Sequence, residues 1–250
     1  NLKVTGLALG SCFGVILAFK LGQIHFILRP VVFAFLFFTL VYGQVFFLYR
    51  QSLHDHAACL RSLRRSFVFL PLVFLIWANM HPSFVLGLVL LLLLPISVLL
   101  DRVILGRDNS GLAGGKVFVS LLLLFGLCFA ATFVNPYFYR LHESILSLAG
   151  SDYFMRLNEE WLRPDFAEYS GKLFESSLML IVFSLFVAGN SRFKWGFFEM
   201  LLLTVFCHFG LQSVRMLPFF GIVASIPFSE ALVNFGNASV FERWSLARRL

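Results

Sequence analysis

The chain has 250 residues, of which 59% are hydrophobic, 13% are charged and 33 are phenylalanines. A mean hydropathy of +0.86 excludes a soluble globular domain and a disordered chain, and it is typical of a helical membrane protein. The net charge of +7 does not indicate nucleic-acid binding, because no basic stretch alternates with aromatic residues and basic loops are the rule on the cytoplasmic side of a membrane.

Apolar runs of roughly membrane-crossing length divide the chain. They fall at about 4–19, 30–49, 67–80, 84–100, 117–134, 173–189, 197–211 and 217–233. A crossing helix needs ~20 residues, so the shorter runs need flanking residues, tilt or a locally thinner bilayer. The pattern predicts an all-α polytopic bundle of about eight transmembrane helices that forms a single domain over residues 1–250.

The number of membrane crossings depends on how the third and fourth apolar runs are interpreted. Residues 67–100 are either two crossings joined by a tight turn or one long helix broken at His81, because Pro82 removes a backbone donor and disfavours helix before it. With two crossings, 13 of the 20 Lys and Arg residues fall on one side of the membrane and 7 on the other. The positive-inside rule therefore favours two crossings, with both ends of the chain in the cytoplasm.

The long connection 135–172 lies on the outer side in this topology. Residues 139–146 are moderately amphipathic, which predicts a short helix along the membrane surface. Further along, carboxylates alternate with aromatic residues, and the candidates there are Asp152, Glu160, Trp161 and Asp165. This segment is either a solvated acidic loop or a strip that contacts a carbohydrate or a cation.

Two arginines are expected at the same outer surface. Arg29 precedes the second run, and Arg215 lies in the short turn between the last two runs. Each alone is typical of an arginine that extends to the membrane surface, but two guanidinium groups at one interface can also bind a phosphate or pyrophosphate. His81, in an outer turn, is either a hydrogen-bonded structural group or a member of the same site.

Other polar residues are explained structurally. Asn135 and Tyr137 flank a proline that ends the fifth run, which suits capping and the interfacial aromatic belt. The tripeptide His54-Asp55-His56 is read as part of a solvated basic loop, 50–66. No ionisable group falls at mid-membrane, which counts against an ion-coupled transporter. No cofactor is evident, and a divalent metal is possible but not indicated because the histidines and the four cysteines form no ligand pattern.

Five short motifs in order resemble those of a family of bacterial polytopic inner-membrane proteins. The family pattern is approximately RPQ, WANLHGGF, NPYG, EWxxPDF and RxxPLF, and the matching segments here begin at Arg29, Trp77, Asn135, Glu160 and Arg215. These proteins look like glycosyltransferases of the GT-C type, which use polyprenyl-phosphate sugar donors at the outer membrane face. The resemblance covers residues 29 to 225, which is most of the chain.

This resemblance implies transfer of a sugar from a lipid-phosphate carrier at the outer face of the bacterial inner membrane. The roles it implies are phosphate binding for Arg29 and Arg215, phosphate orientation for His81, sugar contacts for Glu160, Trp161 and Asp165, and further substrate contacts for Asn135 and Tyr137. The general base is expected from a segment before Asn1 of a longer protein, with Asp152 and Glu160 as the alternatives within the chain.

Three positions depart from the family pattern. Val31 replaces a glutamine, Pro82-Ser83 replace a glycine pair, and Phe138 replaces a glycine. The lost glycines are expected to stiffen the turn after His81.

Two other functions stay open. A transporter or flippase of a lipid-linked substrate would need a continuous polar path through the membrane. A non-catalytic membrane scaffold would leave Arg29, His81 and Arg215 scattered rather than convergent.

Overall fold

A computed structural model of the chain describes residues 12, 14–21, 30–106, 112–151, 153, 159–190 and 195–238. Every regular element in these residues is a helix, which confirms the all-α prediction. The chain divides into two compact units. The four-helix unit comprises Ile27–Asn158 and Gly196–Leu202, and the α8–α10 unit comprises Asn1–Phe26, Glu159–Trp195 and Leu203–Leu250.

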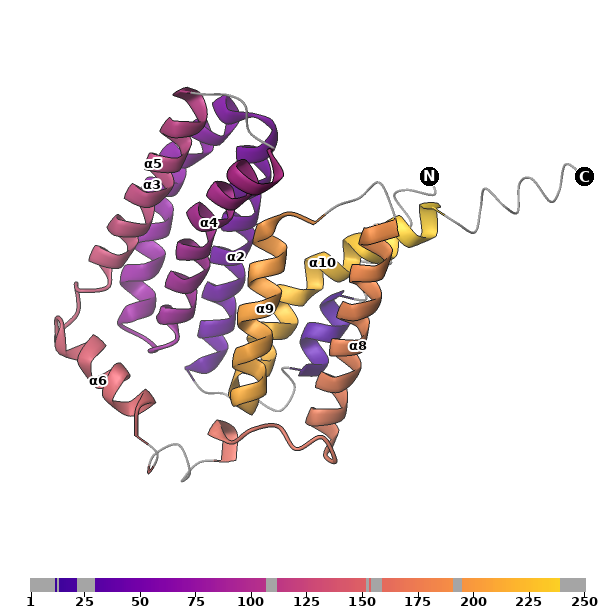
Figure 1. Cartoon of the computed structure of the whole chain (residues 1–250). Helices are drawn as coiled ribbons and strands as arrows, with labels where there is room; N and C mark the ends of the chain where they lie inside the picture. Colours follow the sequence, from indigo (N-terminus) through magenta and orange to yellow (C-terminus); the bar gives the residue numbers. More distant parts are fainter. Residues whose placement is uncertain are drawn as a thin grey trace, which may run out of the picture. The chain divides into compact units, whose positions relative to one another are not determined.

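Long helices that run up and down form the four-helix unit (Figure 1). They are α2 (Val31–His54), α3 (His56–Ala78), α4 (Phe84–Leu105) and α5 (Leu112–Ala131). Helix α2 packs against α3 and α4, and α5 packs against the same two helices. The consecutive helices α3 and α4 therefore lie diagonally opposite each other, and leucine, valine and phenylalanine side chains fill the interior between the four.

The expected helix break within 67–100 is confirmed, whereas two membrane crossings there stay a prediction because α3 is not among the helices apolar enough to cross. Helix α3 ends at Ala78 and α4 begins at Phe84, with Pro82 in the turn between them. The predicted basic loop 50–66 is wrong, because α2 continues to His54 and α3 already begins at His56. Asp55 makes this possible as the N-cap of α3, since its Oδ1 accepts a hydrogen bond from the backbone N–H of Ala58 at 2.8 Å.

Several helices are long and apolar enough to cross a membrane. Within the described residues these are Val31–His54, Phe84–Leu105, Ala113–Ala131 and the Val214–Ala231 stretch that includes most of the last helix, while Phe197–Gln212 is apolar but shorter. These helices make the chain a membrane protein by length and composition. Helices α3 and α8 are not among them, so the count of about eight crossings stays a prediction.

The α8–α10 unit combines helical segments from both ends of the chain. Its helices are α8 (Tyr169–Asn190), the 203–212 part of α9 (Phe197–Gln212) and α10 (Leu217–Ala238), with the short 3-10 turns η2 (Glu159–Trp161) and η3 (Val214–Met216). Helix α10 packs against α8.

Small residues let α10 approach the helical residues 14–21 closely. A Cβ on Gly14 would lie 2.6 Å from the carbonyl oxygen of Ser225, and one on Gly221 would lie 3.0 Å from Cα of Ala18. Neither glycine can therefore carry a side chain without moving a neighbouring backbone. Close backbone contact across small residues is the usual packing of transmembrane helices, so this pair agrees with the membrane assignment.

The predicted short helix in the long connection is present as α6 (Arg140–Ala149), which belongs to the four-helix unit. None of its residues is buried, although its apolar and polar side chains lie on opposite faces. In Figure 1, α6 lies beyond the end of the bundle at which α3 turns into α4.

Candidate functional site

Arg215 lies in η3, where two segments of the α8–α10 unit meet. Its Cζ atom is 4.9 Å from the centroid of the Trp161 ring, and its Nη1 atom is 3.8 Å from Oε2 of Glu160. The Arg215 side chain is 22% exposed and that of Glu160 is 32% exposed. The guanidinium group thus lies between an aromatic face and a carboxylate while remaining in reach of solvent. We call Glu160, Trp161 and Arg215 the arginine cluster.

Backbone contacts hold the arginine cluster together. The N–H of Val214 donates to the carbonyl oxygen of Leu162 at 3.0 Å. The hydroxyl of Ser213, which is buried, donates to the carbonyl oxygen of Glu160 at 2.9 Å across 53 residues of sequence. These two bonds bring η2 and η3 together, so the position of Arg215 relative to Trp161 is set by the backbone and not by side chains alone.

The segment after the cluster folds back onto the start of α8. Asp165 accepts a hydrogen bond at Oδ1 from the N–H of Ala167 at 2.8 Å, which is a local turn of the Asx type. Its carbonyl oxygen lies so close to Gly171 that a Cβ there would overlap it. The ring of Phe166 stacks on that of Phe174 at 6.4 Å. The Asp165 carboxylate therefore shapes the turn between η2 and the start of α8.

His81 belongs to a hydrogen-bonded turn in the four-helix unit. The indole N–H of Trp77 donates to Ser83 Oγ at 3.1 Å, and Ser83 Oγ lies 2.8 Å from Nδ1 of His81. The backbone N–H of Ser83 also donates to Nδ1, at 3.1 Å. Nδ1 is therefore an acceptor, and the neutral ring carries its proton on Nε2. Ser83, where the family pattern has glycine, has ordinary right-handed backbone angles and holds the ring in place.

Asn135 forms a second turn close to the first. Its Oδ1 accepts from the N–H of Tyr137 at 2.8 Å, and its Nδ2 donates to the carbonyl oxygen of Thr132 at 2.8 Å. The ring of Tyr137 is 68% exposed. Phe138 has a φ of 49°, a left-handed conformation that suits the glycine of the family pattern and is unfavourable for phenylalanine.

The structure brings some of the predicted site residues together. Glu160 and Trp161 contact Arg215 within one unit. His81 and Arg215 belong to different units, so their convergence stays a prediction. Arg29 and Asp152 lie outside the described residues.

Sequence reasoning missed the role of His142, on α6. Its ring stacks on that of Phe133 at 4.4 Å and meets Phe84 and Phe129 edge-on at 5.5 Å and 5.8 Å. Its Nε2 lies 2.9 Å from Oγ1 of Thr132. Partial burial among these rings lowers the pKa of His142 below its ordinary value. The histidine thus fastens α6 to the ends of α4 and α5, a contact that no local pattern indicates.

A buried polar network was also missed. The hydroxyl of Tyr49 donates to Oδ2 of Asp101 at 2.6 Å, and Oδ1 of Asp101 accepts from the N–H of Phe197 at 3.4 Å. Nη2 of Arg50 lies 3.0 Å from Oε1 of Glu199, and both carboxylate side chains are 1% exposed. The network joins the ends of α2 and α4 to the first turn of α9, where carboxylates suit the positive end of the helix dipole.

Neither the arginine cluster nor the His81 turn has the set of donor side chains that a metal centre needs. Among the residues that the structure describes, no three His, Cys, Asp or Glu side chains are grouped closely enough to hold a metal ion.

The chain matches no protein-family model, and neither a curated protein nor a solved structure is significantly similar to it.

Proposed function

We propose that the chain is the membrane portion of a GT-C-like glycosyltransferase that transfers a sugar from a lipid-phosphate carrier at the outer face of the bacterial inner membrane. The observation that supports this best is the arginine cluster, in which a partly exposed guanidinium group lies on the ring of Trp161 beside Glu160. The ordered motifs that contain these residues point to the same activity.

The cluster has the chemistry of a site for a phosphate next to a sugar. A guanidinium group binds phosphate oxygens through paired N–H donors, and an aromatic face packs on one side of a sugar ring. The η3 turn that contains Arg215 immediately precedes α10, so an anion bound there would also meet the N-terminal dipole of that helix. Nη1 of Arg215 lies 3.8 Å from Oε2 of Glu160, so a carboxylate stands beside the guanidinium group at this surface.

The roles follow this chemistry. Arg215, with Arg29, would bind the phosphate and stabilise the negative charge on the leaving group. Trp161 and Glu160 would contact the sugar, together with Asp165 in the turn that follows them. His81, Asn135 and Tyr137 would take part only if the two units bring their turns to the same surface.

The proposed topology has eight crossings and both ends in the cytoplasm. Helices α3 and α8 would be the crossings that length and composition alone do not identify. In this arrangement the arginine cluster, the His81 turn and α6 all face the outer side, where lipid-linked sugar donors are used.

Binding of a lipid phosphate tests the proposal. We expect the protein in detergent micelles to bind a long-chain polyprenyl phosphate, measured by native mass spectrometry, and Arg215→Ala to bind it about tenfold more weakly, as loss of one charge-assisted contact predicts. Arg215→Lys should lie between them, because a lysine keeps the charge without the paired donors. Arg163→Ala is the matched control, since it removes an exposed arginine from the same loop.

The outcomes separate the candidate functions. Equal loss in Arg163→Ala and Arg215→Ala would show that only general charge attracts the phosphate, and the assigned role of Arg215 would then be wrong. Binding that depends on Arg215, with movement of the lipid between leaflets but no sugar transfer by the protein in membranes, would favour a flippase.

A further inference from the structure

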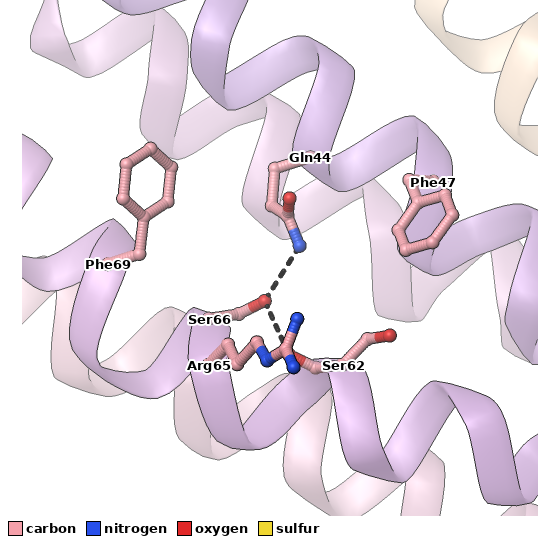
Figure 2. Close-up of a pocket in the computed structure, with 6 residues that line it drawn as sticks. All are labelled: Gln44, Phe47, Ser62, Arg65, Ser66 and Phe69. Carbon is pink, nitrogen blue, oxygen red and sulfur yellow. Dashed lines mark hydrogen bonds between the residues drawn. The ribbon is translucent and has the colours of Figure 1, made fainter.

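A small groove lies between α2 and α3, far along both helices from the His81 turn. It has a volume of about 170 Å³ and is lined by Gln44, Phe47, Ser62, Arg65, Ser66 and Phe69 (Figure 2). The polar groups on the floor of the groove are already hydrogen-bonded to one another. Nε2 of Gln44 donates to Ser66 Oγ at 2.9 Å, and Ser66 Oγ donates to the carbonyl oxygen of Ser62 at 3.1 Å. A ligand would therefore contact the side chains at the rim of the groove rather than those of its floor.

The rim combines one cation with two apolar rings. The side chains of Phe47 and Phe69 are 51% and 43% exposed, and Arg65 is exposed. In Figure 2 the two rings lie on either side of the polar centre, with Arg65 below it. Ser62, Arg65 and Phe69 recur at helical spacing, so they share one face of α3.

The groove lies where α3 changes from polar to apolar. Residues 56–66 of α3 contain three arginines, whereas residues 67–78 contain no charged residue. On the neighbouring helix, α2 has no charged residue before Arg50. Helix α2 is long and apolar enough to cross a membrane, so such a boundary on it and on the adjacent α3 suits the level of the lipid headgroups.

Arg65 differs from Arg50 and Arg215 in its surroundings, because no carboxylate lies beside it among the described residues. Arg50 is paired with Glu199, and Arg215 lies beside Glu160. Arg65 makes neither an ion pair nor a side-chain hydrogen bond with any residue that the structure describes. Two further exposed arginines, Arg61 and Arg64, lie on the same stretch of α3, so the local field attracts anions.

We propose that this groove binds the headgroup of an anionic phospholipid. The phosphate would bind Arg65 and the hydroxyl of Ser62, and the first methylenes of the acyl chains would lie on Phe47 and Phe69. Drug-sized pockets usually exceed ~300 Å³, so a groove of about 170 Å³ takes a headgroup and not a whole lipid. Basic pockets between membrane helices commonly bind anionic headgroups in this way. The proposal rests on the proposed membrane crossing of α3 beside α2 and does not depend on the glycosyltransferase assignment.

Lipid retention by native mass spectrometry tests this site. The protein is purified in detergent and titrated with phosphatidylglycerol or with phosphatidylcholine of the same acyl chains. We expect Arg65→Gln to bind phosphatidylglycerol about tenfold more weakly, because a charge-assisted contact is lost, while binding of phosphatidylcholine changes little. Arg64→Gln is the matched control: it removes an equal charge from the same turn but does not line the groove.

Each outcome decides the proposal. A loss confined to Arg65→Gln, with substantial binding retained by Arg65→Lys, supports a headgroup site in the groove. Equal losses in Arg64→Gln and Arg65→Gln overturn it, because they would show a diffuse electrostatic effect. Displacement of phosphatidylglycerol by inorganic phosphate at a similar concentration also overturns it, since the acyl chains would then contribute nothing. Size-exclusion profiles identical to that of the unaltered protein establish that the variants are folded.

Discussion

The side-chain amide of Asn79 joins the His81 turn to the segment after α5. Its Nδ2 donates to the carbonyl oxygen of Val134 at 2.8 Å across 55 residues of sequence, and to that of Leu75 at 2.8 Å within its own helix. One amide group thus satisfies the end of α3 and fixes the Asn135 turn beside it. The two family-like motifs that contain Asn79 and Asn135 are therefore neighbours in space.

Replacing Asn79 should loosen this junction. Asn79→Ala removes two hydrogen bonds from an exposed site and is expected to cost about 1 kcal/mol, a fall of roughly 2–4 °C in the thermal unfolding midpoint. Asn79→Asp should cost more, because a carboxylate cannot donate and would repel both carbonyl oxygens. Tryptophan fluorescence during heating in detergent measures the midpoints, and an aspartate variant as stable as the parent would contradict the prediction.

The buried pair of Arg50 and Glu199 predicts a large effect from a single change. Arg50→Met leaves the Glu199 carboxylate buried without its cation, and we expect a loss on the order of 2 kcal/mol, moderated because the Arg50 side chain is 29% exposed. The double variant Arg50→Met with Glu199→Gln should recover part of the loss, since no unpaired charge remains. Thermal unfolding of the single and double variants forms the test, and additive losses would argue against the pairing.

The left-handed backbone at Phe138 predicts a stabilising substitution. Phe138→Gly should raise the free energy of unfolding by up to ~1 kcal/mol, because a bulky residue at φ 49° is strained and its side chain is 59% exposed. Loss of the ring contact with Phe133, whose centroid is 5.5 Å away, limits the gain. Tyr139→Gly is the control: Tyr139 has a φ of −67°, so glycine there should destabilise.

The aromatic surroundings of His142 predict a pH-dependent α6. Because the folded state lowers the pKa of His142 from 6.5, the unfolded chain takes up a proton first as the pH falls. The stability that this residue contributes is complete above pH 6.5 and is lost as the pH falls below that value toward the lowered pKa. Hydrogen exchange of residues 140–149, corrected for intrinsic rates, should therefore be faster at about pH 5.5 than at about pH 7.5.

A variant with no titratable group provides the check on this switch. His142→Gln should show little difference in exchange between the two pH values, whereas His208→Gln, at an exposed position on α9, should retain the pH dependence. A pH response that persists in His142→Gln would assign the effect to another residue.

Local sequence properties determined the helices of this protein. Long apolar runs form helices because a buried or lipid-facing backbone must satisfy its own hydrogen bonds, and Pro82 places the break between α3 and α4. The family resemblance places Glu160, Trp161 and Arg215 in one binding site, and that shared role stays a prediction. The helix boundary at Asp55 could not be predicted from the sequence. The basic residues around it are equally typical of a loop and of the polar ends of two helices.

Only the tertiary structure decided which polar groups meet. The bond between Asp101 and Phe197 spans 96 residues, and the aromatic enclosure of His142 draws on α4, α5 and the turn after α5. Neither contact follows from periodicity or spacing, since both depend on which helix ends pack together. The same holds for the groove at Arg65: the sequence shows a basic stretch before an apolar one, and the pairing of α2 with α3 sets that arginine between Phe47 and Phe69.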